Sequence, residues 1–116
     1  MNNIIQIENL NKSFKLFDNE SLKIIKNLSF KVEKNRVISI IGPSGSGKST
    51  FLNIVGLLDF DFSGNFLFHG EDIKKINLDK LNKLRGKSIG FVHQFFHLIP
   101  ELTVLENVML PSLIYN

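Results

Sequence analysis

The sequence contains no cysteine and no tryptophan. Without cysteine there are no disulfides and no thiolate metal sites, so the cytosol is the simpler setting. No apolar run approaches the roughly 18 residues that span a bilayer. The opening MNNIIQIE lacks a basic region followed by a long apolar stretch, so it does not predict a secretory signal. We therefore expect that any role at a membrane is that of a peripheral protein.

Strong net charge is also absent. The formal charge is +3 and does not by itself indicate a nucleic-acid partner, so none is predicted. The charges are nevertheless unevenly placed, because residues 74–87 are rich in lysine and residues 88–116 contain no lysine or arginine. The basic stretch is typical of a solvated helix face. The acidic and apolar end is more unusual.

The composition is otherwise that of a globular protein. The chain has 116 residues, of which 43% are hydrophobic, and this length favours a single domain over residues 1–116. The eleven phenylalanines predict a core built from Phe, Ile and Leu.

Short apolar runs predict several strands. Residues 4–10 and 66–68 form short candidates, and residues 28–33 alternate apolar with polar side chains, as in a half-buried antiparallel strand. Residues 37–41 are nearly continuous and β-branched, which favours a strand covered on both faces. Residues 88–92 predict a further strand, ending at His93. Ser63-Gly64 and His69-Gly70 are turn signals.

Three helices are expected. After the glycine-rich stretch, Phe51, Ile54, Val55 and Leu58 share one helical face. Asn77 can cap a helix that runs to about Arg85, with Leu78, Leu81 and Leu84 facing inward. Thr103 and Glu106 have the spacing of a capping box that opens a last helix after a loop over 94–101. Pro111 is expected to kink or end this helix.

The stretch IGPSGSGKST contains the most specific motif in the chain. It matches GxxxxGK[ST], in which glycines allow the backbone N–H groups to surround phosphates, the lysine reaches the β- and γ-phosphates and the hydroxyl binds Mg²⁺. A chance glycine-rich turn is the alternative, but a predicted strand before it and a helix after it favour the phosphate-binding loop. The residues predicted to hold the nucleotide here are Gly42, Pro43, Ser44, Gly45, Ser46, Gly47, Lys48, Ser49 and Thr50.

Two classes of phosphate-binding protein are not supported. A GTPase would need a downstream NKxD motif, and Asn82-Lys83-Leu84-Arg85 lacks the aspartate. A small-molecule kinase would need several arginines in a lid, but the chain has only Arg36 and Arg85.

Three stretches together resemble the ATP-binding subunit of an ABC (ATP-binding cassette) transporter. They are residues 4–14, the loop continuing to Phe51-Leu-Asn53, and residues 90–108, which resemble the Q-loop and the following helix of that family. The resemblance covers nearly the whole chain and implies an α/β fold of the P-loop NTPase class, as a partial cassette core with an N-terminal antiparallel β subdomain. Within the family, residues 57–64 and the Q-loop are most similar to the lipoprotein-releasing and macrolide-exporter branch.

The resemblance implies roles for residues outside the loop. Phe14 would stack on adenine, although the family often has tyrosine there; Phe14 as a core residue, and Phe17 as the stacking residue, remain alternatives. Gln94 would contact Mg²⁺ or the attacking water, together with Ser49 as the second metal contact. A metal site at His93 and His97 is weak, because no third ligand is near.

The resemblance also implies partners and a location. It predicts ATP and Mg²⁺ as ligands, transmembrane permease subunits and a second ATP-binding subunit as partners, and a cytoplasmic, peripheral position on the inner face of the membrane. The exposed loop residues Phe95, Phe96, Leu98 and Ile99 would help to receive a membrane subunit. Alternatively they pack into the second half of the cassette or into the core of this chain.

The second half of the family pattern is not in the sequence. There is no LSGGQ-like signature, no apolar strand ending in Asp-Glu and no switch histidine. These groups orient Mg²⁺ and the attacking water, so these 116 residues alone are expected to hydrolyse little or no ATP. Residues 37–41 would also lack the strands that flank them in the family. The alternative function is therefore a non-catalytic nucleotide-binding or interaction module.

Overall fold

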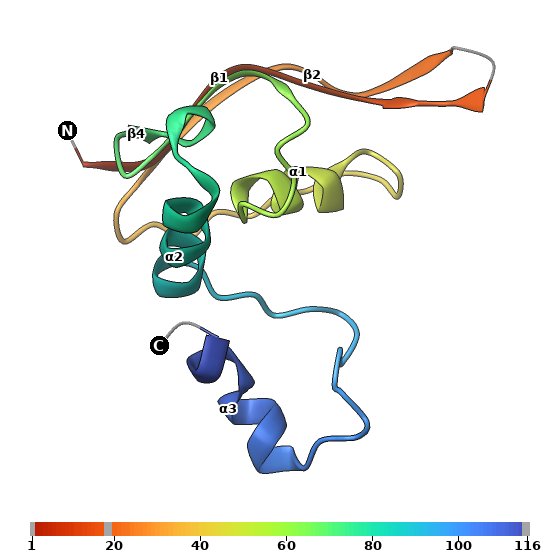
Figure 1. Ribbon diagram of the computed structural model, residues 1–116. Helices are drawn as coiled ribbons and strands as arrows, with labels where there is room; N and C mark the ends of the chain where they lie inside the picture. Colours follow the sequence, from red (N-terminus) through yellow and green to blue (C-terminus); the bar gives the residue numbers. More distant parts are fainter. Residues whose placement is uncertain (1, 18–19, 115–116) are drawn as a thin grey trace. The chain divides into compact units, whose positions relative to one another are not determined.

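The computed structural model describes residues 2–17 and 20–114, and it divides into two compact units between Ile76 and Asn77 (Figure 1). The first unit contains an antiparallel sheet with the strand order β2-β1-β3-β4. No helix of the described ranges is long and apolar enough to cross a membrane. The elements of the first unit are β1 (Asn3–Lys15), β2 (Ser21–Glu33), α1 (Lys48–Val55), β3 (Ser63–Phe68), β4 (Glu71–Asp72) and η2 (Ile73–Lys75), and those of the second are α2 (Leu78–Ser88) and α3 (Val104–Ile114).

β2 confirms the predicted half-buried strand and extends it. Leu28, Phe30 and Val32 are half-buried and alternate with exposed residues, as the sequence predicts. The strand begins seven residues earlier than this alternation, at Ser21. Asn27 interrupts the pattern, since it has a positive φ of 46° and the register of β1 and β2 shifts on either side of it. A period-two pattern cannot be followed through such a bulge.

β1 has a bulge at Asn9. β3, which pairs with β1 on the side opposite to β2, approaches the backbone closely at this point. Asn9 has a φ of 53°, and its N–H donates to Ser29 Oγ at 2.9 Å instead of to the β2 backbone. Asparagine tolerates this left-handed conformation better than most residues. On β3, Gly64 has a φ of 97° and lies so close that a Cβ there would be 2.4 Å from the Asn9 carbonyl oxygen. Only glycine fits this approach.

The buried core lies where α1 contacts the sheet. The Phe51 ring packs edge-on against Phe30 of β2, with centroids 5.7 Å apart. The helix ends at Val55, so Leu58, which was predicted to continue its apolar face, lies beyond it and is exposed. The core is made of Phe, Ile and Leu as predicted, and its members in this unit are Ile7, Leu10, Ile25, Phe51, Ile54, Leu57, Phe66, Phe68 and Ile73.

The predicted strand over 37–41 is not formed. These residues make no strand ladder with any described residue, and the side chains of Val37 and Ile41 are 98% and 90% exposed. A strand of this composition needs neighbours on both sides and cover on both faces. The described residues supply neither, so strong local β propensity is not sufficient to form a strand.

The His69-Gly70 turn is confirmed as the connection of β3 to β4. Both residues have positive φ values, 50° and 81°, as a two-residue hairpin turn requires. The predicted strand at 66–68 is confirmed within β3, and η2 follows with Asp72 as its cap.

In the second unit, α2 begins as predicted. Asn77 caps it, because its Oδ1 accepts the N–H of Lys80 at 2.9 Å. Leu81 is buried and Leu84 half-buried, but Leu78 is 68% exposed, so the prediction that it faces inward is wrong. The predicted strand over 88–92 is also wrong. Ser88 is the last residue of α2, and the described residues 89–92 are not in a strand.

α3 is longer than expected. It continues through Pro111 to Ile114, although proline was predicted to kink or end it. Proline has no N–H to donate to the carbonyl four residues back, so the helix loses that one hydrogen bond. The Ser112 hydroxyl donates to the Met109 carbonyl at 2.7 Å, which satisfies one group of this weakened turn.

The predicted capping box at the start of α3 is present. Thr103 Oγ1 and its N–H both donate to a Glu106 oxygen, at 2.7 and 2.8 Å, and the Glu106 N–H donates back to Oγ1 at 3.3 Å. These bonds favour the ionised carboxylate and hold the pKa of Glu106 below its ordinary value of about 4.5.

We expect the helicity of α3 to fall in acid because of this glutamate. A carboxyl group whose pKa is lowered by folding stabilises the folded form above its ordinary pKa and loses that effect as the pH falls through the lowered value. The far-ultraviolet circular dichroism of the chain should therefore lose helical signal below about pH 4.5. Glu106→Gln retains an acceptor but does not titrate. In this variant the loss of helical signal that is due to protonation of Glu106 should be absent. An unchanged acid profile in the variant would contradict the assignment.

Candidate functional site

The glycine-rich loop connects the unpaired segment 37–41 to the first turn of α1. A turn at Ser44-Gly45 reverses the chain, and the Ser46 N–H donates to the Pro43 carbonyl at 3.2 Å. Gly47 then caps α1 with a φ of 94°. A Cβ at Gly47 would lie 2.6 Å from Ile24 Cγ2, so both the backbone angle and the neighbouring strand require glycine.

The loop turns the N-terminus of α1 into a cluster of donors. The first helical hydrogen bond runs from the Phe51 N–H to the Gly47 carbonyl at 2.9 Å. The N–H groups of Lys48, Ser49 and Thr50 precede this bond and have no acceptor within the helix. Such groups, with the helix dipole, favour an anion.

Lys48 adds a full positive charge at the same place. Its Nζ donates to the carbonyl oxygens of Gly42 and Pro43, both at 2.7 Å, and lies 3.4 Å from Ser46 Oγ. These acceptors are neutral, and the ion pairs formed within residues 2–17 and 20–114 do not include Lys48. The ammonium is thus fixed over the loop while its charge remains uncompensated, which suits a phosphate.

A hollow of about 540 Å³ lies against this loop. The loop and the start of α1 form most of it, and Ile24 of β2 forms the wall opposite. Ile24 was not predicted from the sequence. It belongs to the apolar pair Ile24-Ile25, which is distant in sequence from the phosphate-binding motif and does not indicate a binding site. The lining residues are Ile24, Ser44, Gly45, Gly47, Lys48, Ser49 and Thr50.

The hollow suits a magnesium ion that arrives with a phosphate. Ser49 is exposed on the first turn of α1 and lines the hollow. The described residues contain no group of three or more His, Cys, Asp or Glu side chains that could hold a metal alone. Mg²⁺ normally retains several waters and binds proteins through one or two groups plus substrate phosphates, so one hydroxyl is compatible with it.

Phe14 lies in the same unit as the loop. It stands opposite Leu22 in the β1–β2 register, and Leu22 is two residues along β2 from Ile24, with a register shift between them. Phe14 is 43% exposed and does not belong to the buried core, whereas the rival Phe17 is 96% exposed. One ring face of Phe14 is covered, since the Lys12 ammonium lies 4.9 Å from its centroid.

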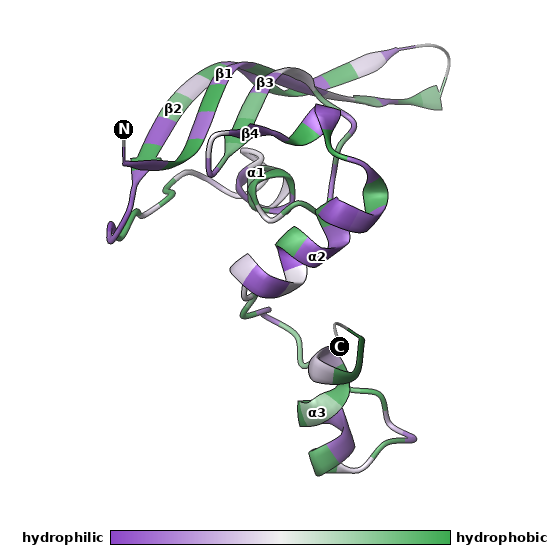
Figure 2. Cartoon of the chain, turned by 60° about the vertical axis from the view of Figure 1, so that its left-hand side comes forward, coloured by the Kyte–Doolittle hydropathy of each residue, from purple (hydrophilic) through white to green (hydrophobic). Residues whose placement is uncertain are grey.

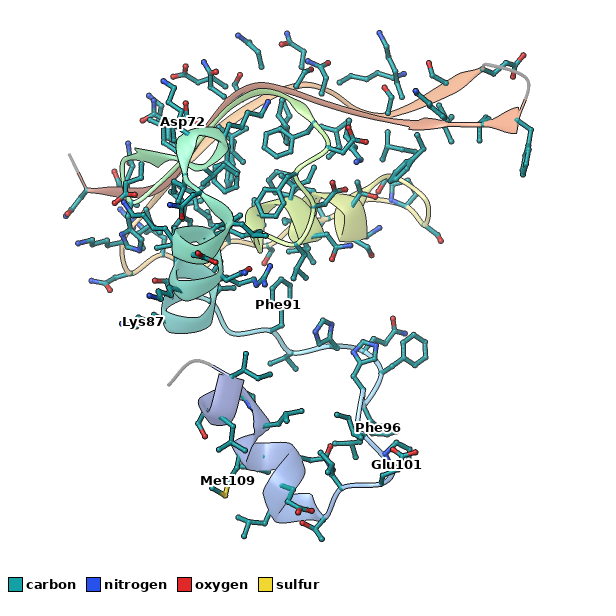
Figure 3. The ribbon with its side chains drawn as sticks, in the orientation of Figure 1. Asp72, Lys87, Phe91, Phe96, Glu101 and Met109 are labelled. Carbon is teal, nitrogen blue, oxygen red and sulfur yellow. The ribbon has the colours of Figure 1, made fainter. Side chains whose placement is uncertain are left out.

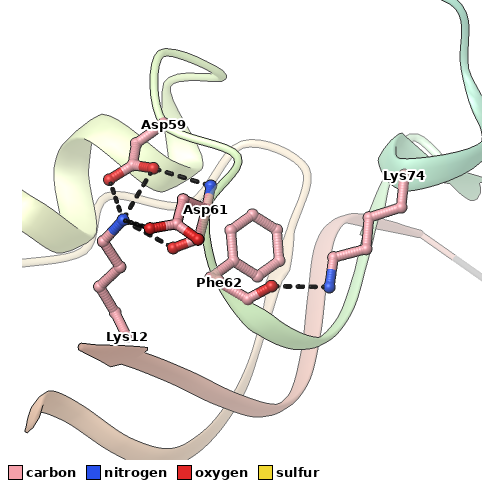
Figure 4. A network of polar contacts seen from close by, with 5 residues as sticks. All are labelled: Lys12, Asp59, Asp61, Phe62 and Lys74. Carbon is pink, nitrogen blue, oxygen red and sulfur yellow. Dashed lines mark hydrogen bonds and ion pairs between the residues drawn. The ribbon is translucent and has the colours of Figure 1, made fainter. Parts of the chain in front are cut away.

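Lys12 is a buried cation that sequence reasoning did not identify (Figure 4). Its Nζ contacts both oxygens of Asp59, at 2.9 and 3.1 Å, and the carbonyl and carboxylate oxygens of Asp61, at 2.6 and 3.2 Å. Burial opposes the charge on Lys12, but these two aspartates outweigh it and raise the pKa above its ordinary value. The only sequence signal was a lysine within an apolar strand.

Gln94 belongs to the second unit. It is exposed in the loop between α2 and α3, and this loop confirms the prediction for residues 94–101. Nearby, the His93 ring stacks on Phe91, with centroids 5.3 Å apart, and lies 4.6 Å from the His97 ring. The residues of the glycine-rich loop, 42–50, lie together in the first unit, whereas Gln94 is not part of that unit.

The second unit carries much exposed apolar surface. No residue of α3 is buried, and hydrophobic residues predominate along it in Figure 2. In the preceding loop, the side chains of Phe91 and Phe96 project from the ribbon in Figure 3, and Phe96 is 91% exposed. The predicted apolar loop residues are all exposed: Phe95, Phe96, Leu98 and Ile99.

The sequence matches a known family over most of its length. The family described as ABC transporter matches residues 25–115. The chain is 40% identical over 113 residues to the lipoprotein-releasing system ATP-binding protein LolD of Zymomonas mobilis, and 45% identical over 113 residues to the ABC transporter ATP-binding protein YvrO of Bacillus subtilis. Each match covers 97% of this chain and 48% of the relative. The chain thus spans about half the length of the curated relatives it matches.

Solved structures agree with the sequence relatives. The dimeric structure of MJ0796, a bacterial ABC transporter cassette, superposes with a TM-score of 0.88 at 41% identity. A post-hydrolysis state of the same cassette, bound to ADP and Pi, superposes with a TM-score of 0.87 at 40% identity. Both matches cover 97% of this chain and 48% of the other. The expected fold class is therefore confirmed, as part of an ABC ATPase cassette.

Proposed function

The chain belongs to the ABC transporter family, and from this premise we propose that it binds Mg-ATP as the N-terminal part of a transporter's ATP-binding subunit. The observation that carries the proposal is the loop itself. Donor groups at the start of α1 and the uncompensated Lys48 ammonium converge beside one hollow. This arrangement selects a multiply charged anion of the size of a polyphosphate.

We assign each residue of the site one task. The backbone N–H groups of residues 42–50, apart from Pro43, surround the phosphates. The Lys48 ammonium leaves its carbonyl acceptors for phosphate oxygens, which are stronger acceptors because they are charged. The Ser49 hydroxyl binds Mg²⁺, whose chemistry in such sites is to neutralise phosphate charge. The exposed face of Phe14 stacks on adenine, and Gln94 contacts Mg²⁺ or the attacking water.

We propose that these 116 residues bind ATP without turning it over at a useful rate. Phosphoryl transfer depends on positioning and on charge stabilisation, and the sequence offers no Asp-Glu pair to orient the metal and the water. The chain also matches only about half of each relative. The second candidate, a non-catalytic nucleotide-binding or interaction module, is favoured by the same two observations. Robust hydrolysis by the pure chain would exclude this candidate.

The relatives suggest the cellular context. LolD proteins are named for lipoprotein release. We therefore propose that the complete subunit couples ATP binding and hydrolysis to lipoprotein release or a related export. The partners would be transmembrane permease subunits and a second ATP-binding subunit, at the inner face of the membrane. The exposed apolar side chains of residues 91–114 support a protein partner for the second unit.

The test of the proposed function is a calorimetric titration of the purified chain with Mg-ATP, together with circular dichroism. We expect saturable binding of one nucleotide per chain and hydrolysis no faster than the background. A chain that is folded by circular dichroism but binds neither ATP nor ADP would overturn the proposal.

Ser49→Ala should remove the magnesium dependence of this binding. Without the hydroxyl, the metal loses its protein contact, so we expect about a tenfold loss of affinity for Mg-ATP, which is the size of one charge-assisted contact. The affinity for ATP in EDTA should be unchanged. Ser39→Ala, in the segment before the loop, is the matched control and should change neither value. Equal losses with and without magnesium would argue against metal contact by Ser49.

A further inference from the structure

We propose that Lys12 is a positioning residue for the base-binding side chain: its ammonium, held by Asp59 and Asp61, supports one face of Phe14 so that the other face receives adenine. The inference rests on the proposed function, because it concerns the same nucleotide site. It assigns a task to a buried cation that the phosphate-binding motif does not explain.

The Lys12 ammonium cannot move freely. It is 3% exposed and has four oxygen contacts between 2.6 and 3.2 Å, which use all three of its N–H donors. The Asp61 N–H in turn donates to Asp59 Oδ1 at 2.9 Å, which fixes the carboxylate. A lysine side chain is normally flexible, and here its end is held at one position.

The fixed charge of Lys12 lies over the ring of Phe14. The distance of 4.9 Å from Nζ to the ring centroid is within the range of a cation–π interaction. The ammonium attracts the π electrons toward its own side of the ring. The opposite face then becomes less negative and accepts another π system more readily, and the 43% exposure of Phe14 leaves surface for it.

The anchors of Lys12 lie in the segment that follows α1. Asp59 and Asp61 are four and six residues beyond Val55, the last residue of the helix, and α1 begins with the candidate phosphate-binding residues. Lys12 therefore links the strand that carries the aromatic ring to the segment that follows this helix. Such a link fixes the distance between the base and the phosphate positions, which a nucleotide must match.

The test compares Mg-ATP with inorganic tripolyphosphate as calorimetric ligands. Lys12→Met removes the charge and keeps an apolar side chain of similar length. We expect it to lower the affinity for Mg-ATP about five- to thirtyfold, the range of a desolvated cation–π contact, and to leave tripolyphosphate binding unchanged. In a Phe14→Ala background, Lys12→Met should have no further effect on ATP, because the residue through which it acts is gone.

Two further variants separate positioning from stability. Lys12→Met combined with Asp59→Asn removes both charges of the closest pair, so the half-buried Asp59 carboxylate is not left unpaired, and the Asp61 carboxylate that remains is exposed. This double variant should show the same selective loss of ATP affinity. Lys74→Met is the matched control, because the Lys74 ammonium also lies over a phenylalanine ring, 4.5 Å from the Phe62 centroid. This substitution should leave the affinities for Mg-ATP and for tripolyphosphate unchanged. Thermal melting of each variant reports any change in stability.

The outcomes distinguish this inference from the proposed function. If the wild-type chain binds neither ligand, the proposed function fails and the inference fails with it. If the wild type binds both ligands but Lys12→Met weakens them equally, or weakens neither, only the inference is overturned. A loss confined to ATP and absent from the Phe14→Ala background supports it.

Discussion

Lys48→Ala is expected to lower the affinity of the chain for Mg-ATP by about 100-fold or more while leaving the fold intact. Two charge-assisted hydrogen bonds to phosphate oxygens contribute about 1.5–3 kcal/mol each, and a loss of 2.7 kcal/mol is already a hundredfold change. In the structure the ammonium already lies within the loop, against the Gly42 and Pro43 carbonyls, so little ordering is needed to bind phosphate. Calorimetry of both proteins measures the effect directly.

The control for this change is Lys31→Ala. Lys31 is an exposed cation on β2, paired with Gln6 in the register and outside the hollow, so the substitution removes the same charge at another place. It should leave ATP affinity within about twofold. A Lys48→Ala chain that melts like the wild type and still binds ATP with unchanged affinity would refute the assignment of the loop.

The candidate site could be located from the sequence because its motif is local. A phosphate-binding loop needs glycines, a lysine and a hydroxyl at fixed spacing, and each can be identified without knowing the fold. The capping groups Asn77 and Thr103 were predictable for the same reason, since a cap and the backbone N–H that donates to it are three residues apart. Local rules of this kind depend on chain geometry alone.

The errors and omissions in the sheet share one cause, which is that strands depend on partners distant in sequence. Segment 37–41 has the composition of a buried strand, yet it forms no ladder with the described residues. Likewise, Lys12 and its anchors are 47 and 49 residues apart, so no local pattern connects them. The bulge at Asn9 and the glycine opposite it are a third case, because two ordinary turn-forming residues become complementary only when β1 and β3 pair.

That complementarity leads to the largest expected effect on stability. Gly64→Ala should lower the free energy of unfolding by about 3 kcal/mol or more, and it could prevent folding of so small a chain. The new methyl group would lie 2.4 Å from the Asn9 carbonyl oxygen and 2.7 Å from that of Glu8, and both belong to the backbone of the central strand. Neither atom can move without separating β1 from β3. Urea denaturation followed by circular dichroism measures the loss.

Gly70→Ala separates the two parts of this effect. Gly70 also has a positive φ, 81° compared with 97° at Gly64, but a Cβ there would meet nothing within 4 Å. Gly70→Ala therefore reports the cost of the left-handed backbone alone, about 1–2 kcal/mol. The excess loss in Gly64→Ala is the cost of the contact with β1. If the two variants lost equal stability, the close approach of Gly64 to Asn9 would not contribute, and the bulge in β1 would not be what restricts position 64 to glycine.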